Sequence, residues 1–252
     1  MMAMLKKECK EILATYRWLL LPCIFLLLGL GQPVSFKFMP EILKSAKLPE
    51  GTVLQIPMPS PAEVVSSILG QFNQIGVLMI ILVVMGTVAQ EKASGISAGV
   101  LVKPLGKGSY LFAKFIAYLG LTAAAFALGM AAGAFYTQLL IGDVNWYAVM
   151  LGSLAYLPYL ILAVALTIFT STLFSTQVAA GGTALLGMLA FSLLPKLAEW
   201  SAKLFPSALT EQAGKVIAGK TPPQIWHPIS FSIGLIALFM VLAWLSLKRQ
   251  EL

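Results

Sequence analysis

The chain has 252 residues, of which 59% are hydrophobic and 11% are charged. Soluble domains carry roughly 25% charged residues, so this composition excludes an ordinary soluble globular protein. The charged side chains are clustered, and five long runs contain none: residues 18–36, 64–90, 115–142, 144–195 and 221–247. A membrane-spanning helix needs about 20 mostly apolar residues, so four of these runs can hold one helix each and the longest can hold two.

We therefore predict an all-α polytopic membrane protein with one transmembrane domain over residues 1–252. The six predicted spans are approximately 17–36, 68–89, 113–138, 147–173, 177–195 and 229–247. The segments between them reach about 40 residues, whereas independent domains usually need 50 or more, so no nucleotide-binding or other soluble domain is expected. Barrel strands alternate apolar and polar residues. Residues 75–88 are apolar almost throughout, which excludes a barrel.

The residues ahead of the first span, about 3–16, predict a short amphipathic helix that lies on the membrane surface. Its apolar residues stand between Lys and Glu residues and are Leu5, Ile12, Leu13 and Tyr16. A secretory signal peptide is the competing interpretation, because Lys6 and Lys7 precede an apolar stretch. Glu8 and Glu11 dilute that positive charge and the apolar stretch begins late, so the surface helix is favoured.

The second helix is expected to begin before its predicted span. Six prolines between residues 33 and 61 predict an irregular loop after the first span. At the end of this loop, Ser60, Pro61 and Glu63 match a capping box with proline at the first helical position. The helix should therefore start near Pro61, outside the membrane.

The segment between the second and third spans predicts a docking element. Residues 90–114 read as a charged helix end, a glycine break, a short helix over about 96–102 and a Pro/Gly turn. A loop that only reconnects two helices has no need to expose Ile96, Val100 and Leu101. Apolar side chains on a short helix between charges favour binding in a partner's groove.

Two later features concern helix packing and the outer surface. Gly129 and Gly133 form a GxxxG motif in the third span, which serves either the pairing of two subunits or packing within one. Residues 196–228 predict short external helices, about 196–204 and 207–218, at the outer interface.

Enzymatic chemistry is not expected in this chain. Residues 214–221 satisfy the phosphate-loop pattern G-x-x-x-x-G-K-[ST]. That motif needs a preceding strand, and the residues before it predict a helix. The single histidine, His227, leaves no catalytic triad or His-based metal cluster. Cys9 and Cys23 are expected to be small packing residues that form no disulfide with each other.

The distribution of Lys and Arg predicts a cell-membrane protein with both termini in the cytoplasm. With the N-terminus inside, ten lie inside: Lys6, Lys7, Lys10, Arg17, Lys92, Lys103, Lys107, Lys114, Lys248 and Arg249. Seven lie in the longer outside segments: Lys37, Lys44, Lys47, Lys196, Lys203, Lys215 and Lys220. The higher density inside follows the positive-inside rule. Because the basic residues flank spans, the net charge of +7 indicates a lipid bilayer and no nucleic acid.

The segment between the second and third spans resembles that of ABC-2 type transporter permeases. Members of that family carry a pattern close to E-[RK]-E-x-G-T, then a leucine-rich turn, a proline and a Lys-Phe pair. The matching residues here are Glu91-Lys92-Ala93-Ser94-Gly95-Ile96, Leu101, Pro104, Tyr110 and Lys114-Phe115. Ala93 and Ile96 depart from the pattern, and the six-span layout extends the resemblance over the whole chain.

The resemblance implies the permease subunit of an ATP-driven export system. Such a permease pairs with a second permease subunit, identical or different, and docks two copies of a separate ABC ATPase. The chain itself is then no enzyme and holds no cofactor, since the partner binds ATP and Mg. The residues assigned by the resemblance to a cytoplasmic coupling helix and its flanks are Glu91, Lys92, Gly95, Ile96, Val100, Leu101 and Pro104.

The predicted spans contain almost no charged residues, and such an interior favours the transport of an amphipathic or apolar compound, such as a peptide, lipid or drug. As a hypothesis, Gln71, Asn73 and Gln74 at the outer end of the second span face the translocation route. The alternative function is a stand-alone helical channel or membrane scaffold without an ATPase. An intramembrane enzyme is disfavoured because the sequence offers no nucleophile–base pair or metal set.

Overall fold

The computed structural model describes residues 2–45, 59–94, 107–197, 204–220, 222 and 224–249. Within these residues the chain is helical and contains no strand. Six helical segments are long and apolar enough to cross a membrane: Arg17–Met39, Pro61–Ala93, Lys107–Leu140, Trp146–Leu173, Gln177–Leu194 and Trp226–Arg249. The predicted fold class, all-α with six spans, is therefore confirmed.

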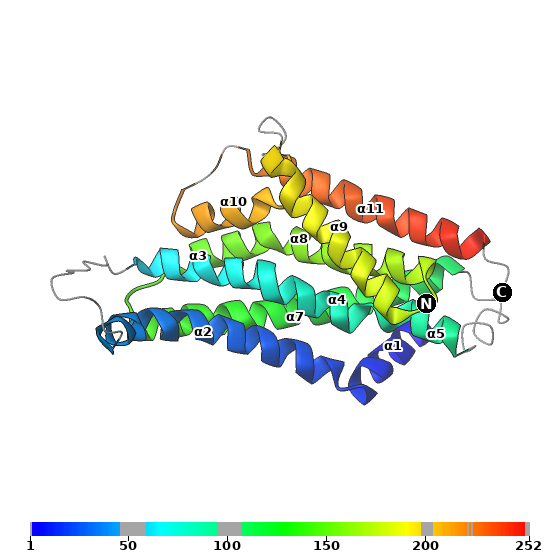
Figure 1. Ribbon diagram of the computed structural model, residues 1–252, viewed down its shortest axis with the longest axis horizontal. Coiled ribbons are helices and arrows are strands. Elements are labelled where there is room, and N and C mark those ends of the chain that lie inside the picture. Colours follow the sequence, from blue (N-terminus) through cyan, green and yellow to red (C-terminus); the bar gives the residue numbers. More distant parts are fainter. Residues whose placement is uncertain are drawn as a thin grey trace.

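The helices form an elongated bundle (Figure 1). Its elements are α1 (Met2–Ala14), α2 (Arg17–Ser45), α3 (Pro61–Gln71), the π-helix η1 (Phe72–Gly76), α4 (Val77–Val84), α5 (Gly86–Ala93), α7 (Lys107–Leu140), α8 (Trp146–Leu173), α9 (Gln177–Leu197), α10 (Ala208–Ile217) and α11 (Trp226–Arg249). We call the end that holds α1, α5 and the last turn of α11 the terminal end, and the end that holds the start of α3 and α10 the distal end. The second span is thus built from four pieces, α3, η1, α4 and α5.

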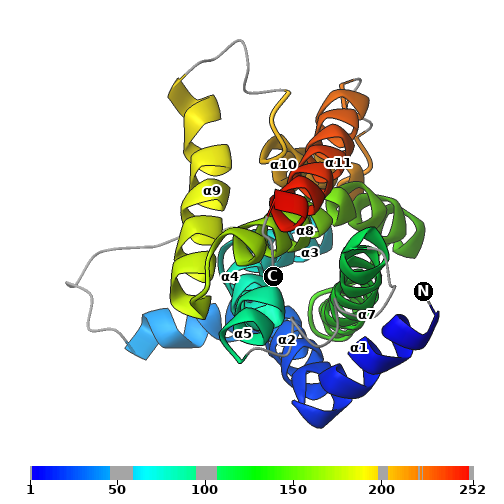
Figure 2. The ribbon, with the colours of Figure 1, turned by 90° about the vertical axis from the view of Figure 1, so that its right-hand side faces the viewer.

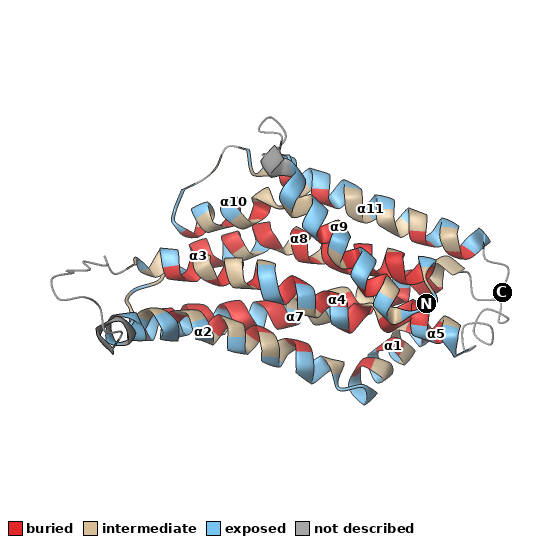
Figure 3. Cartoon of the chain, viewed as in Figure 1, coloured by how far each residue is buried: buried red, intermediate tan, exposed pale blue. Residues whose placement is uncertain are grey.

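Helix α8 lies at the centre of the bundle (Figure 2). It contacts α7, α9, α10, α11 and the second span, and buried residues follow it along its length (Figure 3). In contrast, only 11% of the residues in the most apolar stretch of α11 are buried, and 22% of those in the corresponding stretches of α2 and α9. These three helices therefore present most of their apolar surface to the outside of the bundle, where a bilayer would cover it.

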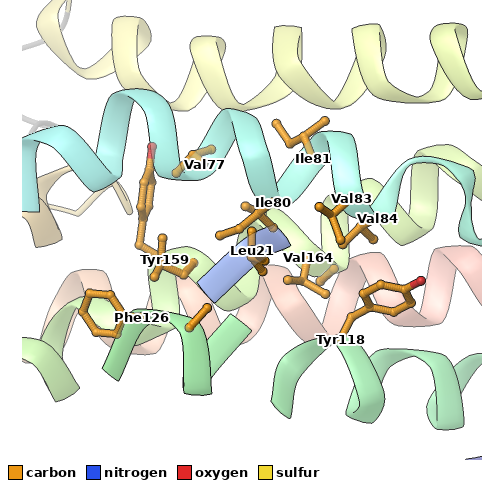
Figure 4. Close-up of a cluster of buried hydrophobic side chains, with 14 of the residues drawn as sticks. Leu21, Val77, Ile80, Ile81, Val83, Val84, Tyr118, Phe126, Tyr159 and Val164 are labelled. Atoms are coloured by element: carbon orange, nitrogen blue, oxygen red, sulfur yellow. The ribbon is translucent and has the colours of Figure 1, made fainter. Parts of the chain in front are cut away.

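Aromatic rings and small residues form the middle of the core. The Phe25 ring lies 4.8 Å from Phe72, and Phe126 lies 5.7 Å from both Phe72 and Tyr156, measured between ring centroids. These contacts join α2, η1, α7 and α8. Figure 4 shows neighbouring buried side chains, in which Leu21 of α2 and Ile80 of α4 lie between the ribbons of α4 and α7, near Val164 of α8. The core is thus continuous across four elements.

The start of the second span follows its local sequence. The Ser60 hydroxyl accepts a hydrogen bond from the Glu63 amide, and the Glu63 carboxylate accepts one from the Ser60 amide, with Pro61 at the first helical position. This reciprocal cap satisfies two amides that the helix would otherwise leave without partners. The predicted capping box is confirmed.

The amphipathic helices follow the sequence expectation in position, and the structure adds which of their faces are buried. In α1, Leu13 is 53% and Tyr16 after it 70% exposed, while Met4, Glu8 and Ile12 are buried. The buried face is rotated because α1 packs on α7, so part of the predicted apolar face is left exposed. The second predicted external helix appears as α10, whereas α9 extends to Leu197 and residues 198–203 of the first lie outside the described part.

Helix α10 packs on α8 and α3 and does not lie apart from the bundle. Gly152 of α8 makes this approach possible, because a Cβ there would lie 2.6 Å from Ile217 Cγ1 and 2.9 Å from the Ala213 carbonyl oxygen. The Ser66 hydroxyl of α3 donates a hydrogen bond to the Gly214 carbonyl at 3.1 Å. Helix α10 therefore closes the distal end over the second and fourth spans.

Candidate functional site

A group of buried charged side chains joins three helices at the terminal end. Lys114 of α7 is 0% exposed, and its Nζ lies 3.0 Å from Glu8 Oε2 of α1 and 3.2 Å from Glu91 Oε1 of α5. Both carboxylates are also buried. Because burying a charge is costly unless an opposite charge lies beside it, these ion pairs hold α1, α5 and α7 in one arrangement.

Lys7 and Tyr110 complete the group around Glu91. Lys7 Nζ donates a hydrogen bond to Glu91 Oε1 at 2.6 Å, and the Tyr110 hydroxyl donates one to Glu91 Oε2. Lys114 Nζ also lies 5.0 Å from the centroid of the Tyr110 ring, within cation–π range. We call Lys7, Glu8, Glu91, Tyr110 and Lys114 the terminal ion cluster. Glu91 is thus anchored by both carboxylate oxygens to neighbouring helices.

Helical periodicity explains why these side chains meet. Met4, Glu8 and Ile12 are four residues apart and form the buried face of α1, so Glu8 enters the bundle between two apolar neighbours. Tyr110 and Lys114 are likewise one turn apart on α7, and both are buried. Each helix therefore inserts its polar groups toward the end of the second span.

The terminal ion cluster shifts the pKa values of its two residues on α1, Glu8 and Lys7. Burial raises the pKa of Glu8 above its ordinary value, and the ion pair with Lys114 offsets only part of that effect. Burial acts to lower the pKa of Lys7, but the hydrogen bond and charge of Glu91 outweigh it, so this pKa is raised. Lys7 therefore keeps its positive charge at neutral pH.

The three carboxylates near the cluster have ion partners within the chain. The carboxylates of Glu8, Glu11 and Glu91 approach within 4.8 Å of one another, a spacing that could suit a metal ion. However, Lys114 lies against Glu8 and Glu91, and Lys7 lies against Glu91. These ammonium groups already supply the positive charge that a metal would bring. The arrangement therefore suits mechanical connection of helices better than metal binding.

Ser171 of α8 holds a break in the second span, at Met85, six residues before Glu91. Helix α4 ends at Val84 and α5 begins at Gly86. The Ser171 hydroxyl accepts hydrogen bonds from the amides of Val88 at 3.0 Å and Ala89 at 2.9 Å, and it donates one to the Met85 carbonyl at 2.8 Å. A side chain of α8 thus replaces helical hydrogen bonds at this break.

The start of α5 is packed closely on α9. A Cβ on Gly86 would lie 3.1 Å from the Gln177 side chain, and one on Gly181 would lie 2.6 Å from Met85 Sδ. At the other end of α5, Lys92 Nζ donates a hydrogen bond to the Thr172 carbonyl. Helix α5 is therefore a short, separate unit that is fastened by side chains to α1, α7, α8 and α9.

The structure describes part of the predicted coupling segment. Glu91 is 6% exposed and lies in the terminal ion cluster, and Lys92 is partly buried against the end of α8. The remaining predicted residues, Gly95, Ile96, Val100, Leu101 and Pro104, lie outside the described residues. Glu91 therefore connects helices of its own chain and presents little surface to a partner.

The three polar residues predicted for a translocation route lie at a π-helical turn. Gln71 ends α3, and Asn73 and Gln74 belong to η1. Gln71 and Asn73 are partly buried and Gln74 is exposed. Within the described residues, the buried Asn73 Oδ1 accepts no hydrogen bond. Single π-turns are often found at functional sites because they offset the side chains of a helix.

The GxxxG motif packs two helices of the same chain. A Cβ on Gly129 would lie 2.6 Å from the Phe25 carbonyl oxygen, and one on Gly133 would lie 2.9 Å from the Gly29 carbonyl oxygen. Both glycines therefore face α2, and the close approach of α2 and α7 depends on the absence of their side chains.

Several important residues were not identified from the sequence as a site. Glu8 was read only as diluting a positive N-terminus, Lys114 as part of a motif, and Ser171 received no role. A usable signal for the first two is a carboxylate or an ammonium on the apolar face of a helix, in a chain with few charges. Residues 214–217 of the phosphate-loop match lie within α10, whereas such a loop precedes its helix.

Comparisons with known proteins give one family and one relative that this chain resembles. Residues 41–245 match the family described as ABC-2 family transporter protein. The chain is also 31% identical over 259 residues to the uncharacterized transmembrane protein YxlG of Bacillus subtilis, and the alignment covers all of this chain and 98% of that protein. The similarity thus extends across all six candidate spans.

Proposed function

Because the chain belongs to the ABC-2 transporter family, we propose that it is the permease subunit of an ATP-driven exporter in the cytoplasmic membrane. It pairs with a second permease, identical or different, and two copies of a separate ABC ATPase bind ATP and Mg. Both termini lie in the cytoplasm, so the terminal end of the bundle faces the ATPases. The higher density of Lys and Arg predicted for this side supports that orientation.

The observation that carries the proposal is the terminal ion cluster at the end of the second span. Glu91 directly precedes the segment that resembles a coupling helix, and Lys114 lies in the first turns of α7, the span that follows it. Displacement of the segment by an ATPase is therefore transmitted to α5 and α7 together. Glu8 and Lys7 extend the same connection to α1.

The break at Met85 gives the movement a place to occur. Helix α5 is separated from α4 at this residue, and Ser171 supplies hydrogen bonds that a continuous helix would make internally. A hydroxyl can exchange such bonds at lower cost than a helix can break its own, so α5 can tilt against α4. Movement at the terminal end then alters how the second span packs on α8.

The cargo of the proposed transporter is amphipathic or apolar, such as a peptide, a lipid or a drug. It passes Gln71, Asn73 and Gln74 near the distal end, where the π-turn offers polar side chains in an otherwise apolar helix. The unpartnered Asn73 Oδ1 supports this assignment, because a buried polar atom without a partner can accept a hydrogen bond from cargo or water.

Co-purification and ATP turnover test the function. We expect an ABC ATPase to co-purify with the full-length chain from native membranes, and cargo-dependent ATP hydrolysis to fall at least about tenfold in Glu91→Gln. This variant keeps the size of residue 91 but weakens its attraction to Lys7 and Lys114. The matched control is Glu211→Gln, which alters an exposed ion pair with Lys215 at the distal end.

A stand-alone channel or scaffold predicts different results. Such a protein would purify without an ATPase, and crosslinks placed at residues 95–104 would capture no nucleotide-binding partner. Ion or solute flux independent of ATP would favour the channel. An ATPase that co-purifies and remains fully stimulated in Glu91→Gln would instead preserve the transporter and remove the role of the terminal ion cluster.

A further inference from the structure

An apolar groove runs between α7 and α11 at the terminal end, and none of its lining residues belongs to the terminal ion cluster. It has a cavity volume of about 200 Å³ and is lined by Gly108, Leu111, Phe112, Met240, Val241 and Trp244. Phe112 is 47%, Val241 52% and Trp244 39% exposed. The groove therefore opens to the side of the bundle, where acyl chains surround a membrane protein.

Glycine and tryptophan shape one end of this groove. A Cβ on Gly108 would lie 3.6 Å from Cδ1 and Nε1 of the Trp244 indole, so the ring already lies close to the backbone of α7. Tryptophan is favoured at the boundary between hydrocarbon and head groups. The groove thus reaches from the hydrocarbon region to the level at which lipid phosphates lie.

Three cationic side chains gather at the same end. Lys248 Nζ lies 5.4 Å from the Trp244 ring centroid, and Arg249 is the next residue of α11. Lys107 begins α7 beside Gly108, and its Nζ donates a hydrogen bond to the Leu247 carbonyl at 3.0 Å. The six lining residues include no acidic side chain. An apolar slot therefore ends beneath a compact set of positive charges.

We propose that this groove binds one anionic phospholipid. An acyl chain lies against Phe112, Val241 and Trp244, and the phosphate lies near Lys248 and Arg249. Cationic residues next to a membrane helix attract anionic head groups. The placement in the inner leaflet rests on the proposed orientation of the permease. The shape and charge of the groove do not depend on it.

The two halves of the site favour a lipid over other occupants. Lys248 and Arg249 are exposed, so a free phosphate would gain only a weak, screened attraction. An apolar helix of a paired subunit would fill the slot but would bring no negative charge to Lys248 and Arg249. An anionic phospholipid satisfies both parts with one molecule.

Native mass spectrometry of the full-length chain in detergent tests the proposal with phosphatidylglycerol and phosphatidylcholine as probes. We expect phosphatidylglycerol to be retained preferentially, and the Lys248→Gln/Arg249→Gln double variant to lose about tenfold or more in affinity for it. The double variant Lys6→Gln/Lys10→Gln is the control, because it removes two exposed cations from α1 at the same end. That variant should bind phosphatidylglycerol as the unaltered protein does.

A second variant separates the groove from the charge. Val241→Trp adds an apolar side chain to an exposed wall of the slot, and it should reduce phosphatidylglycerol binding at least about fivefold with all cations intact. Inorganic phosphate at millimolar concentration should not displace the lipid.

Three results would overturn the lipid site. These are equal binding of both lipids, equal losses in the two double variants, and unchanged binding in Val241→Trp. A stable dimer that excludes the lipid would assign the groove to a paired subunit instead. None of these measurements involves an ATPase, so failure here leaves the proposed transport function standing.

Discussion

The two halves of the second span are constructed in opposite ways. In the terminal half, Glu91 is buried and each of its carboxylate oxygens has a partner on another helix. In the distal half, η1 replaces an α-helical turn close to the middle of the span and carries Asn73, whose Oδ1 is buried without a hydrogen bond in the described part of the chain. The terminal half is therefore tightly connected, and the distal half retains a polar atom that can still accept a hydrogen bond.

The difference fits two tasks of the ATP-driven transporter that we propose. An end that receives force must be connected to several helices, so that they move together. A region that contacts varied cargo benefits from polar groups that are not already hydrogen-bonded to other protein groups. The comparison predicts large structural effects for changes at the terminal end and selective transport effects for changes at η1.

The largest expected effect follows from removing the central cation of the cluster. Lys114→Met keeps the length of the side chain but leaves Glu8 and the Oε1 atom of Glu91 without this partner. Breaking a buried ion pair by removing one member costs about 3–5 kcal/mol. We expect the free energy of unfolding, measured in detergent micelles, to fall by about 3 kcal/mol.

The control for this variant is Lys215→Met, which removes a half-exposed cation paired with Glu211 at 2.5 Å. Exposed pairs contribute about 0–1 kcal/mol, so its stability should barely change. Equal losses in the two variants would show that the terminal ion cluster is no stronger than a surface pair.

A smaller effect is expected at the break in the second span. Ser171→Ala removes the acceptor for the Val88 and Ala89 amides, and leaving buried donors without partners costs about 1–3 kcal/mol. Hydrogen exchange at these two amides should accelerate while exchange in α4 stays unchanged. Cargo-dependent ATP turnover should fall as well, because α5 loses one of its side-chain connections to α8.

Ser153→Ala tests whether any serine of α8 behaves in this way. The Ser153 hydroxyl donates only within its own helix, to the Val149 carbonyl at 2.7 Å. Its removal should leave exchange in α5 unaltered. Unchanged exchange at Val88 and Ala89 in Ser171→Ala would refute the assignment of Ser171 as the fastening of α5.

The smallest effect on stability is expected at η1. Asn73→Ala removes an oxygen that has no partner within the described residues, so the free energy of unfolding should change by less than about 1 kcal/mol. Transport in reconstituted vesicles should nevertheless decline, and Gln71→Ala and Gln74→Ala extend the series. Thr183→Ala, an exposed position on α9, is the control. Full transport by all three variants would remove these residues from the route.

Local patterns in the sequence predicted features that depend on neighbouring residues. The charge-free runs predicted six spans, and the reciprocal cap of Ser60 and Glu63 marked the start of the second. The break at Met85 carries no proline, so nothing in the local pattern distinguished it from continuous helix. The π-turn at residues 72–76 was equally unpredicted, because it depends on how Phe72 packs between α2 and α7.

The amino-acid sequence alone determined that this chain is an all-helical membrane protein, because apolar runs without charge have no other stable form in a bilayer. It also placed Glu91 at the end of a span. Only the tertiary structure decided that Glu91 turns inward to Lys114, since residues 8, 91 and 114 are far apart in the chain and meet through helix packing. The same packing directed Gly129 toward α2, because close contact depends on the surface that the neighbouring helix offers.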